Sequence, residues 1–281
     1  MLINNKKFDF ENKTYTMGIL NLTPDSFSDG GSYIDVETAL ERAKKMVEEG
    51  VDIIDVGAES TRPGATYIEE EIELERILPV VKKLVTELDI PISIDTYKPR
   101  VAEECIKVGA HIINDIKGLK GDPQMAEIIA KYGVFVIIMH IKGDPKTMQK
   151  NIEYNNIIED IKGSLQESVD MAIKAGVSPK NIILDPGIGF GKTFEDNLKI
   201  IKKLCEFKKL GYPILIGASR KGFIGDILGT PPLDRVEGNL VVAAISAYNG
   251  ASIIRGHEVK ETVKALKMAD AIKSIKDEKV F

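Results

Sequence analysis

The chain has 281 residues, of which 43% are hydrophobic and 29% charged, a composition typical of a soluble globular protein. Its net charge of −5 at pH 7 argues against non-specific nucleic-acid binding, which needs basic patches. No apolar run is long enough to span a membrane, and residues 1–13 lack a signal-peptide core. Cys105 and Cys205 have no metal-ligand spacing, so both are predicted to fill the core of a cytoplasmic protein.

Residues 1–13 predict a short hairpin, with a turn at Asn4-Asn5 or Glu11-Asn12. After it, apolar strand-like runs alternate with helix-like segments. The predicted strands are Thr16–Asn21, Val51–Val56, Pro91–Asp95, His111–Asp115, Val134–His140, Asn181–Asp185, Pro213–Gly217 and Ser252–Arg255. The predicted helices are Val36–Glu49, Glu69–Leu88, Val101–Val108, Gln124–Tyr132, Ile157–Ala175, Phe194–Phe207, Val236–Tyr248 and Val259–Ile272.

The same junction recurs along the chain. A helix ends in glycine, the usual residue just past a helix C-terminus, and a β-rich run follows. These glycines are Gly50, Gly109, Gly133, Gly176, Gly211 and Gly250. Eight such units of about 35 residues each predict one α/β domain over residues 1–281, a (β/α)8 TIM barrel with a short N-terminal hairpin. An open doubly wound sheet is the alternative; regular units without insertions favour closure. Lys273–Phe281 is predicted to be a loose tail.

The stretch Asn181–Thr193 carries the most specific chemistry. Its strand run ends in Asp185, Pro186 stops the strand, and three glycines let the backbone approach a flat ligand. A phosphate loop is excluded because Pro186 occupies the position of the first glycine of that pattern. An ordinary strand-to-helix turn remains the alternative for this stretch taken alone.

Every predicted strand brings polar side chains to its C-terminal end, where a TIM barrel builds its active site. The groups at these ends are Asn21, Glu59 with Thr61-Arg62, Asp95, Asn114-Asp115, His140, Asp185, Ser219-Arg220-Lys221, and Arg255 with His257. The acids and the amide suit a heterocycle with amide and amino edges. The cations in an acidic protein suit an anionic ligand such as a diphosphate.

In these motifs the chain resembles the dihydropteroate synthase family from the first strand to the eighth. The motifs are Asn21–Gly31, Gly57–Gly64, Ser93–Thr96, Asn114-Asp115, Met139-His140, Asp185–Thr193, Gly217–Gly222 and Arg255–His257. The resemblance implies condensation of hydroxymethyl-dihydropterin diphosphate with p-aminobenzoate, giving dihydropteroate and diphosphate. It also implies a homodimer, and a target of sulfonamide antibacterials.

The resemblance also implies roles for single residues. The pterin site would comprise Asp95, Asn114, Met139, Asp185, Phe190 and Lys221. The diphosphate site would comprise Asn21, Arg62, Arg255 and His257, with Mg2+ held between Asn21 and the diphosphate. The p-aminobenzoate site would comprise Phe27, Thr61, Arg62, Pro63 and Ser219, with Asp29 in the same first loop. Asp95, Lys221, Arg255 and His257 would be the catalytic groups.

The implied reaction is substitution at the pterin methylene, in which diphosphate leaves first and the arylamine then attacks. Two other functions share the pterin-binding groups: a methyl-tetrahydrofolate-dependent methyltransferase and a non-catalytic pterin-binding barrel. The cationic rim and the loops after the first two strands favour the synthase over both.

Several residues have two interpretations. His140 either satisfies a strand end or touches ligand, and His111 is predicted to be structural. Lys192 is either a site residue or a solvated residue at a helix start, and Arg220 either binds ligand or pairs with an acid. Asp55 is interpreted as a paired acid inside the barrel, without an assigned role. Three residues depart from the family pattern: Asp196, Gly256 and Glu258.

Overall fold

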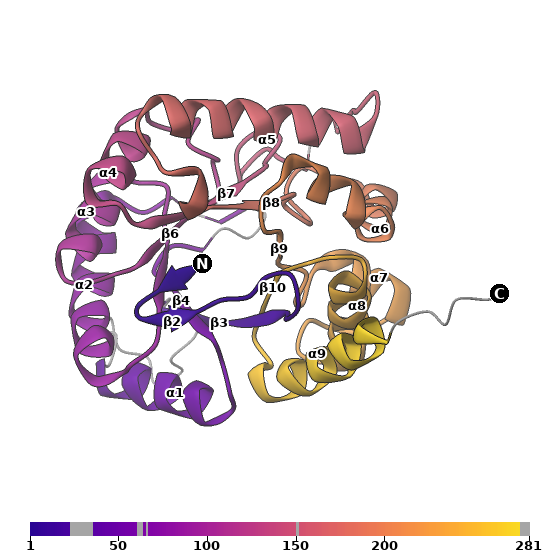
Figure 1. Ribbon diagram of the computed structural model, residues 1–281, viewed down its shortest axis with the longest axis horizontal. Helices are drawn as coiled ribbons and strands as arrows, with labels where there is room; N and C mark the ends of the chain where they lie inside the picture. The colour runs from indigo at the N-terminus through magenta and orange to yellow at the C-terminus, as the bar shows by residue number, and fades with distance from the viewer. Residues whose placement is uncertain (23–35, 61–63, 66, 150–151, 276–281) are drawn as a thin grey trace.

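The computed structural model describes residues 1–22, 36–60, 64–65, 67–149 and 152–275 (Figure 1). Within them, one parallel sheet has the strand order β8-β7-β6-β5-β4-β3-β10-β9. Its strands are β3 (Tyr15–Asn21), β4 (Ile53–Gly57), β5 (Ile92–Asp95), β6 (Ile112–Asp115), β7 (Phe135–Met139), β8 (Ile182–Asp185), β9 (Leu215–Ile216) and β10 (Ile253–Gly256). Leu184 forms a parallel bridge with Ile214, and its N–H donates to the Pro213 carbonyl at 2.9 Å. The sheet is thus closed between β8 and β9, and the predicted TIM barrel is confirmed.

Helices surround the barrel as Figure 1 shows. They are α1 (Val36–Glu48), α2 (Glu70–Glu87), α3 (Pro99–Lys107), α4 (Gln124–Tyr132), α5 (Ile157–Lys174), α6 (Phe194–Lys202), α7 (Gly222–Leu228), α8 (Val236–Tyr248) and α9 (Val259–Ser274). α7 was not predicted, because a helix of seven residues is too short to display a 3.6-residue period.

Three further predictions need correction. The helix predicted over Phe194–Phe207 ends at Lys202 and is followed by the 3-10 helix Leu204–Leu210, which an apolar period does not separate from an α-helix. Cys205 lies in this 3-10 helix and is exposed, so it fills no core, whereas Cys105 is buried as predicted. The predicted loose tail begins too early, because α9 includes Lys273 and Ser274; residues 276–281 lie outside the described residues.

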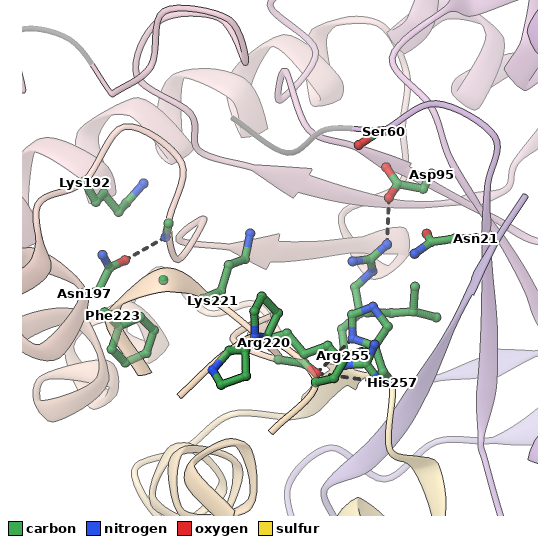
Figure 2. A pocket seen from close by; sticks show the side chains of 18 of the residues that line it. Asn21, Ser60, Asp95, Lys192, Asn197, Arg220, Lys221, Phe223, Arg255 and His257 are labelled. Atoms are coloured by element: carbon green, nitrogen blue, oxygen red, sulfur yellow. Dashed lines mark hydrogen bonds and ion pairs between the residues drawn. The ribbon is translucent and has the colours of Figure 1, made fainter. Parts of the chain in front are cut away.

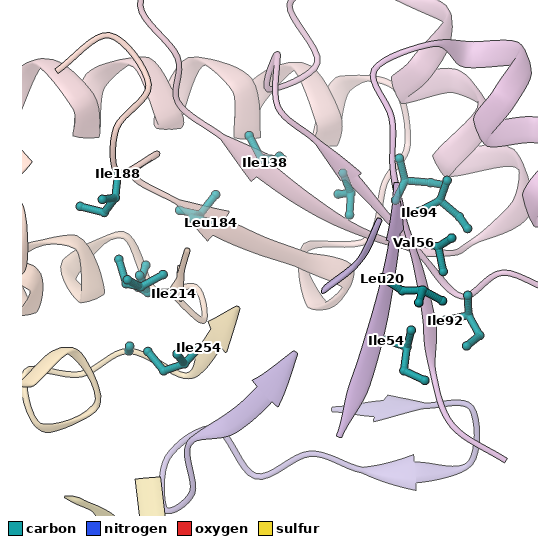
Figure 3. Close-up of a cluster of buried hydrophobic side chains, with 14 of the residues drawn as sticks. Leu20, Ile54, Val56, Ile92, Ile94, Ile138, Leu184, Ile188, Ile214 and Ile254 are labelled. Carbon is teal, nitrogen blue, oxygen red and sulfur yellow. The ribbon is translucent and has the colours of Figure 1, made fainter. Parts of the chain in front are cut away.

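The main hydrophobic core lies between the barrel and its helices. Along each strand, alternate side chains point outward and pack against the helices. Figure 3 shows members of this layer on several strands, including Ile54, Val56, Ile94, Ile138 and Leu184. All five side chains are fully buried. Strands of a parallel barrel are covered on both faces, so nearly all of their side chains are expected to be buried.

The other side chains of the strands fill the inside of the barrel, and its N-terminal end is apolar. This inner apolar layer consists of Met17, Ile53, Ile112, Ile137, Ile183, Leu215 and Ile253. The predicted hairpin is confirmed as β1 (Leu2–Ile3) and β2 (Lys6–Lys7), with Asn4 and Asn5 at positive φ in its turn. Ile3 and Phe8 pack against the inner layer, so the hairpin closes this end.

Two residues further along four of these strands, the inner positions are polar. Ile53 is followed by Asp55, Ile112 by Asn114, Ile183 by Asp185 and Ile253 by Arg255. Since side chains two apart in a strand share a face, these groups belong inside the C-terminal end of the barrel. The fold therefore gathers acids, an amide and an arginine at one end. Within the described residues, no helix is long and apolar enough to cross a membrane.

Candidate active site

A cavity of about 1310 Å³ opens at the C-terminal ends of the strands (Figure 2). Six of the predicted site residues line it: Asn21, Asp95, Ser219, Lys221, Arg255 and His257. Four others, Asn114, Met139, Asp185 and Phe190, are buried and join this group through the contacts described below. The remaining four, Phe27, Thr61, Arg62 and Pro63, lie outside the described residues, so their roles stay predictions.

Arg255 connects two acids inside the barrel. Its Nε donates to Asp55 Oδ2 at 2.6 Å, and its Nη2 donates to Asp95 Oδ2 at 2.7 Å. Asn114 Nδ2 donates to the same Asp55 oxygen at 3.0 Å. Asp55 is completely buried, which confirms that it is a paired acid of the barrel interior and shows what it pairs with. One carboxylate therefore orients both an amide and a guanidinium of the predicted site.

Asp95 is poised to exist in either protonation state near neutral pH. Burial raises its pKa to about 7, against the attraction of Arg255 and with the help of the neighbouring Asp55 charge. For Arg255, burial alone would lower the pKa, but Asp55 and Asp95 outweigh it and raise it. Among the described residues, Asp55 Oδ1 and Asp95 Oδ1 are buried without a hydrogen-bond partner. Buried acceptors of this kind are normally satisfied, so these two oxygens indicate a missing donor.

Asp185 ends β8, as the Asn181–Thr193 stretch predicts. The N–H of Gly187 donates to Asp185 Oδ1 at 2.7 Å, while burial raises the pKa of this carboxyl to about 6. Gly187 has φ 72°, and a Cβ built there would lie 1.9 Å from the His140 carbonyl oxygen. Glycine is thus required at this turn by both its backbone angle and the space around it. The bare backbone beside the acid, expected from the sequence, is present.

An apolar wall stands beside the acids. Met139 and Phe190 belong to one buried cluster with Ile116 and Met148. The Lys221 ammonium lies 4.0 Å from the centroid of the Phe190 ring, a cation–π geometry. A flat apolar surface next to hydrogen-bonding groups suits an aromatic heterocycle.

A second polar network lies at the end of β10. Ser219 Oγ is 2.9 Å from His257 Nδ1 and donates to Glu258 Oε2 at 3.2 Å. Arg220 pairs with Glu258 Oε1 at 2.6 Å, so it pairs with an acid, as one of its two interpretations required. Asn239 Nδ2 also donates to Glu258, at 3.1 Å. Glu258 therefore connects Ser219, Arg220 and Asn239. It thereby holds in place the edge of the cavity that Ser219 and His257 line.

Burial and hydrogen bonds describe the surroundings of the other ambiguous residues, and whether His140 touches ligand stays a prediction. The Nδ1 of His111 accepts from the Ile92 N–H at 3.2 Å, which is a structural role. Lys192 is 2% exposed and lines the cavity, so the interpretation as a solvated residue is wrong. His140 is buried and its Nδ1 lies 3.0 Å from Lys192 Nζ. Asp196 caps α6 through a capping box with Thr193, which is consistent with a purely local effect of that departure.

The roles of Asp55 and Glu258 were not predicted from the sequence. A signal for Asp55 was available, because Ile53-Ile54-Asp55 has the same inward-outward-inward pattern as Ile183-Leu184-Asp185. Glu258 had no such signal, since it follows the strand and reaches its partners only through the fold of β9, α8 and β10.

A magnesium site fits the residues only in a limited way. No group of three or more metal-ligating His, Cys, Asp or Glu side chains occurs within the described parts of the chain. Asn21 lines the cavity at the end of β3 and offers one amide oxygen. One protein oxygen matches an ion that is held mostly by water and substrate phosphates, the usual manner of Mg2+.

The fold and the site define a pterin-binding enzyme, and comparison with known proteins agrees. Residues 17–257 match the family described as pterin binding enzyme. The chain is 48% identical to dihydropteroate synthase of Clostridium beijerinckii, over 97% of this chain and 99% of that one.

Two solved structures are similar throughout. Yersinia pestis dihydropteroate synthase in complex with a sulfonamide drug has a TM-score of 0.93 and 41% identity, covering 98% of this chain and 99% of that one. The Xanthomonas albilineans synthase with 4-aminobenzoic acid has a TM-score of 0.88 and 38% identity, covering 94% and 95%. The chain therefore belongs to the dihydropteroate synthase family. Its activity is that of a transferase in folate biosynthesis, and the predicted function is confirmed.

Proposed function

We propose that the cavity condenses 6-hydroxymethyl-7,8-dihydropterin diphosphate with p-aminobenzoate, and that its residues take the roles that the sequence predicts. The observation that carries this proposal is the position of two acids, the buried Asp185 and the largely buried Asp95, at the same barrel end as the cations Lys221 and Arg255 and the imidazole of His257. The acids suit the N–H edges of a pterin, and the cations suit its diphosphate.

The pterin ring would lie against Phe190 and Met139. Asp185 accepts from its amino and ring N–H groups, Asn114 bonds beside it, and Lys221 donates to its carbonyl side. Because Asp55 fixes Asn114, the amide is oriented before the ring arrives. The unpartnered Asp95 Oδ1 supplies a further acceptor for the ring.

The diphosphate would be bound by Asn21, Arg62, Arg255 and His257. Bound Mg2+ at Asn21 would supply further neutralisation of the phosphate oxygens. Arg255 enters this site already held by two carboxylates, so its guanidinium is directed before substrate binds. Such preorganised charge is usually the largest catalytic contribution of a site, with one donor worth about 3 kcal/mol.

The reaction breaks the bond between the pterin methylene carbon and the bridging oxygen, and the electron pair leaves with diphosphate. Asp95 stabilises the positive charge that spreads into the ring. The arylamine nitrogen then attacks the methylene carbon, and the new ammonium group gives up a proton to water or to the departed diphosphate. The p-aminobenzoate would be placed by Ser219 together with Phe27, Thr61, Arg62 and Pro63.

The likeness to synthases over nearly the whole chain favours the condensation over the two alternative functions. A methyltransferase of this barrel type would need the pterin groups but no diphosphate cations. A non-catalytic barrel would need neither the cations nor the p-aminobenzoate groups. The cations that line the cavity are thus accounted for by the synthase alone.

The test is release of diphosphate from the pterin diphosphate in the presence of Mg2+, with and without p-aminobenzoate. We expect release to depend on p-aminobenzoate and to be accompanied by dihydropteroate. Reactions with chelator in place of Mg2+ test the metal separately, and we expect turnover to fall. Absence of any p-aminobenzoate-dependent product would overturn the proposal.

We also propose that the chain is a homodimer that forms through the exposed apolar faces of α8 and α9. Val241, Ile245 and Tyr248 lie on one face of α8 at helical spacing, and Met268 and Ile272 lie on one face of α9. Tyr248 is 60% exposed and Met268 63%. Exposed apolar patches on neighbouring helices usually mark an association surface, and two-fold homodimers are the commonest oligomers.

Light scattering during size-exclusion chromatography tests this surface. We expect a dimer for the natural chain and a monomer for Val241→Lys combined with Ile245→Lys. A natural chain that elutes as a monomer at micromolar concentration would contradict the proposal. A cytoplasmic location stays a prediction from the sequence.

A further inference from the structure

Lys192 is a buried amine that the proposed mechanism does not use. It lies between β8 and α6, and its side chain meets three neutral acceptors. Its Nζ donates to the Phe190 carbonyl at 2.9 Å and to the His140 carbonyl at 3.3 Å, and lies 3.0 Å from His140 Nδ1. Three acceptors match the three protons of an ammonium group. Its hydrogen-bond partners are thus neutral, while Asp185 and Asp196 attract its charge without an ion pair among the described residues.

These contacts join the two segments that build one wall of the cavity. His140 follows β7, and its N–H donates to the Asp185 carbonyl at 2.9 Å. Phe190 carries the ring that faces Lys221. Lys192 thus ties the strand end beside Asp185 to the loop that carries the aromatic wall. Figure 2 shows Lys192 and Asn197 on this side of the cavity, where Asn197 Oδ1 accepts from the Gly189 N–H at 2.7 Å.

The amine also acts on Asp185 through its charge. Among the described residues, the ionisable groups near it include Asp185 on β8, His140 after β7, Asp196 on α6, and Lys221 after β9. Burial lowers the pKa of Lys192 to about 7, against the attraction of Asp185. Burial lowers the pKa of His140 to about 2, with Lys192 adding to the effect, so the imidazole is neutral and its Nδ1 accepts. The nearby positive charge favours the carboxylate form of Asp185.

We propose that Lys192 is a positioning residue for pterin recognition, which locks the Asp185–Phe190 wall through the two carbonyls and keeps Asp185 ionised. The inference rests on the proposed function, because it takes Asp185 to be the pterin acceptor. Nothing in the reaction requires Lys192 to touch the substrate. Its effect reaches the ring through Asp185 and Phe190.

The charge effect gives a readout that a purely structural role would not produce. Asp185 binds the ring as a carboxylate, so pterin affinity falls as pH drops through the pKa of Asp185. Loss of the Lys192 charge raises that pKa. The midpoint of the acid limb should therefore move to higher pH, by about one unit.

The experiment is calorimetric titration of the protein with 6-hydroxymethylpterin between pH 4.5 and 7.5, with circular dichroism at each pH to confirm folding. Lys192→Met removes the charge and the donors but keeps an unbranched side chain. Lys192→Gln removes the charge but keeps donors, and it serves as the second variant if Lys192→Met does not fold. Lys199→Met is the matched control, since Lys199 is an exposed lysine on α6.

We expect both Lys192 variants to shift the acid limb upward, and Lys192→Met also to weaken binding about tenfold at pH 7.5, the loss of roughly one buried hydrogen bond. Lys199→Met should match the natural chain. An acid limb at the same pH in all four proteins, with unchanged affinity, would overturn this inference. Asp185→Asn in the same titration keeps the two proposals apart: if it binds pterin as the natural chain does, the role assigned to Asp185 is wrong.

Discussion

The two ends of the barrel interior use the same strands for opposite purposes. At the N-terminal end, the inner side chains are apolar, and Ile3 and Phe8 of the hairpin pack against them. Two residues later along four of those strands, the inner side chains are Asp55, Asn114, Asp185 and Arg255. The backbone geometry is alike at both ends. The difference is therefore one of side-chain chemistry imposed on a common scaffold.

The two ends contribute differently to the stability of the fold. Burying an isoleucine side chain stabilises a fold by about 1.5–3 kcal/mol. Burying a carboxylate costs free energy unless it is paired, and among the described residues Asp55 and Asp95 share one ion-pair partner, Arg255. Each also keeps one buried oxygen without a partner among the described residues. The buried acids at the C-terminal end thus lower the stability of the fold, and a ligand that donates hydrogen bonds to them would offset this cost. The apolar side chains at the N-terminal end supply the stabilising burial.

Arg255→Met should have the largest effect, because it leaves two buried acids without their cation. We expect the free energy of unfolding in urea at pH 7.5 to fall by about 3–5 kcal/mol, and turnover to fall at least about a hundredfold. The loss of stability should shrink at pH 5, where Asp95, whose pKa is raised to about 7 by burial, takes up a proton. Arg100→Met removes an exposed arginine on α3 and should cost at most about 1 kcal/mol. Equal losses of unfolding free energy for Arg255→Met and Arg100→Met would show that Arg255 does not neutralise costly buried acids.

Ile183→Ala probes the other end through the same strand that carries Asp185. Ile183 is fully buried in the inner apolar layer, so we expect a loss of about 2–5 kcal/mol of unfolding free energy. Pterin affinity of the folded variant should stay within about twofold, because the cavity lies at the opposite end. Urea unfolding and pterin titration measure the two quantities. A large fall in affinity with little change in stability would show that the ends are not separable in this way.

Asp185→Asn should reverse that pattern. The amide keeps the shape of the side chain but loses the charge, so pterin binding should weaken by about 1.5–3 kcal/mol, roughly ten- to a hundredfold. The free energy of unfolding at pH 7.5 should hold or rise, because the natural carboxyl is buried and burial raises its pKa. Calorimetry with 6-hydroxymethylpterin and urea unfolding measure both. Stability lost in step with affinity would count against the assignment.

The last prediction concerns pH, and its effect over a single pH unit is the smallest of the four. Burial raises the pKa of Asp95 to about 7, so the folded state holds a proton that the unfolded state has lost above its ordinary value near 4. The folded state binds more protons in this window, and stability falls as pH rises from about 4 to 7. Relative to Asp95→Asn, the natural chain should lose up to about 1.4 kcal/mol per pH unit there. Urea unfolding at several pH values measures the difference, in which contributions such as that of His140 cancel. A pH-independent difference would mean that Asp95 is ionised throughout.

The sequence predicts the scaffold well because local signals repeat. Glycine after each helix and apolar runs of strand length place the strand ends to within one or two residues of β3, β6 and β8. Once the strands are parallel and closed, their C-terminal residues must share one rim. Asp95, Lys221 and Arg255 follow from that argument alone, because each sits at or just beyond a strand end.

The missing parts depend on contacts that no local pattern contains. Lys192 has the sequence position of a solvated helix start, and only the packing of its loop against His140, which follows β7, shows that it is buried. Glu258 gathers Ser219, Arg220 and Asn239 from other elements. Neither set of contacts can be predicted from a hydrophobic period or from the spacing of a motif. Such residues are found only in the structure, by identifying the hydrogen-bond partner of each buried polar atom.

The tight turn after Asp185 limits how this protein can respond to inhibitors. Gly187 and Gly191 both have positive φ, and a Cβ at either would lie within 2.5 Å of a backbone oxygen, that of His140 or of Lys142. Single substitutions at these two positions would therefore damage the turn before they could exclude a competitor. A compound that fills the space beside this turn would face a surface with few mutational routes to drug resistance.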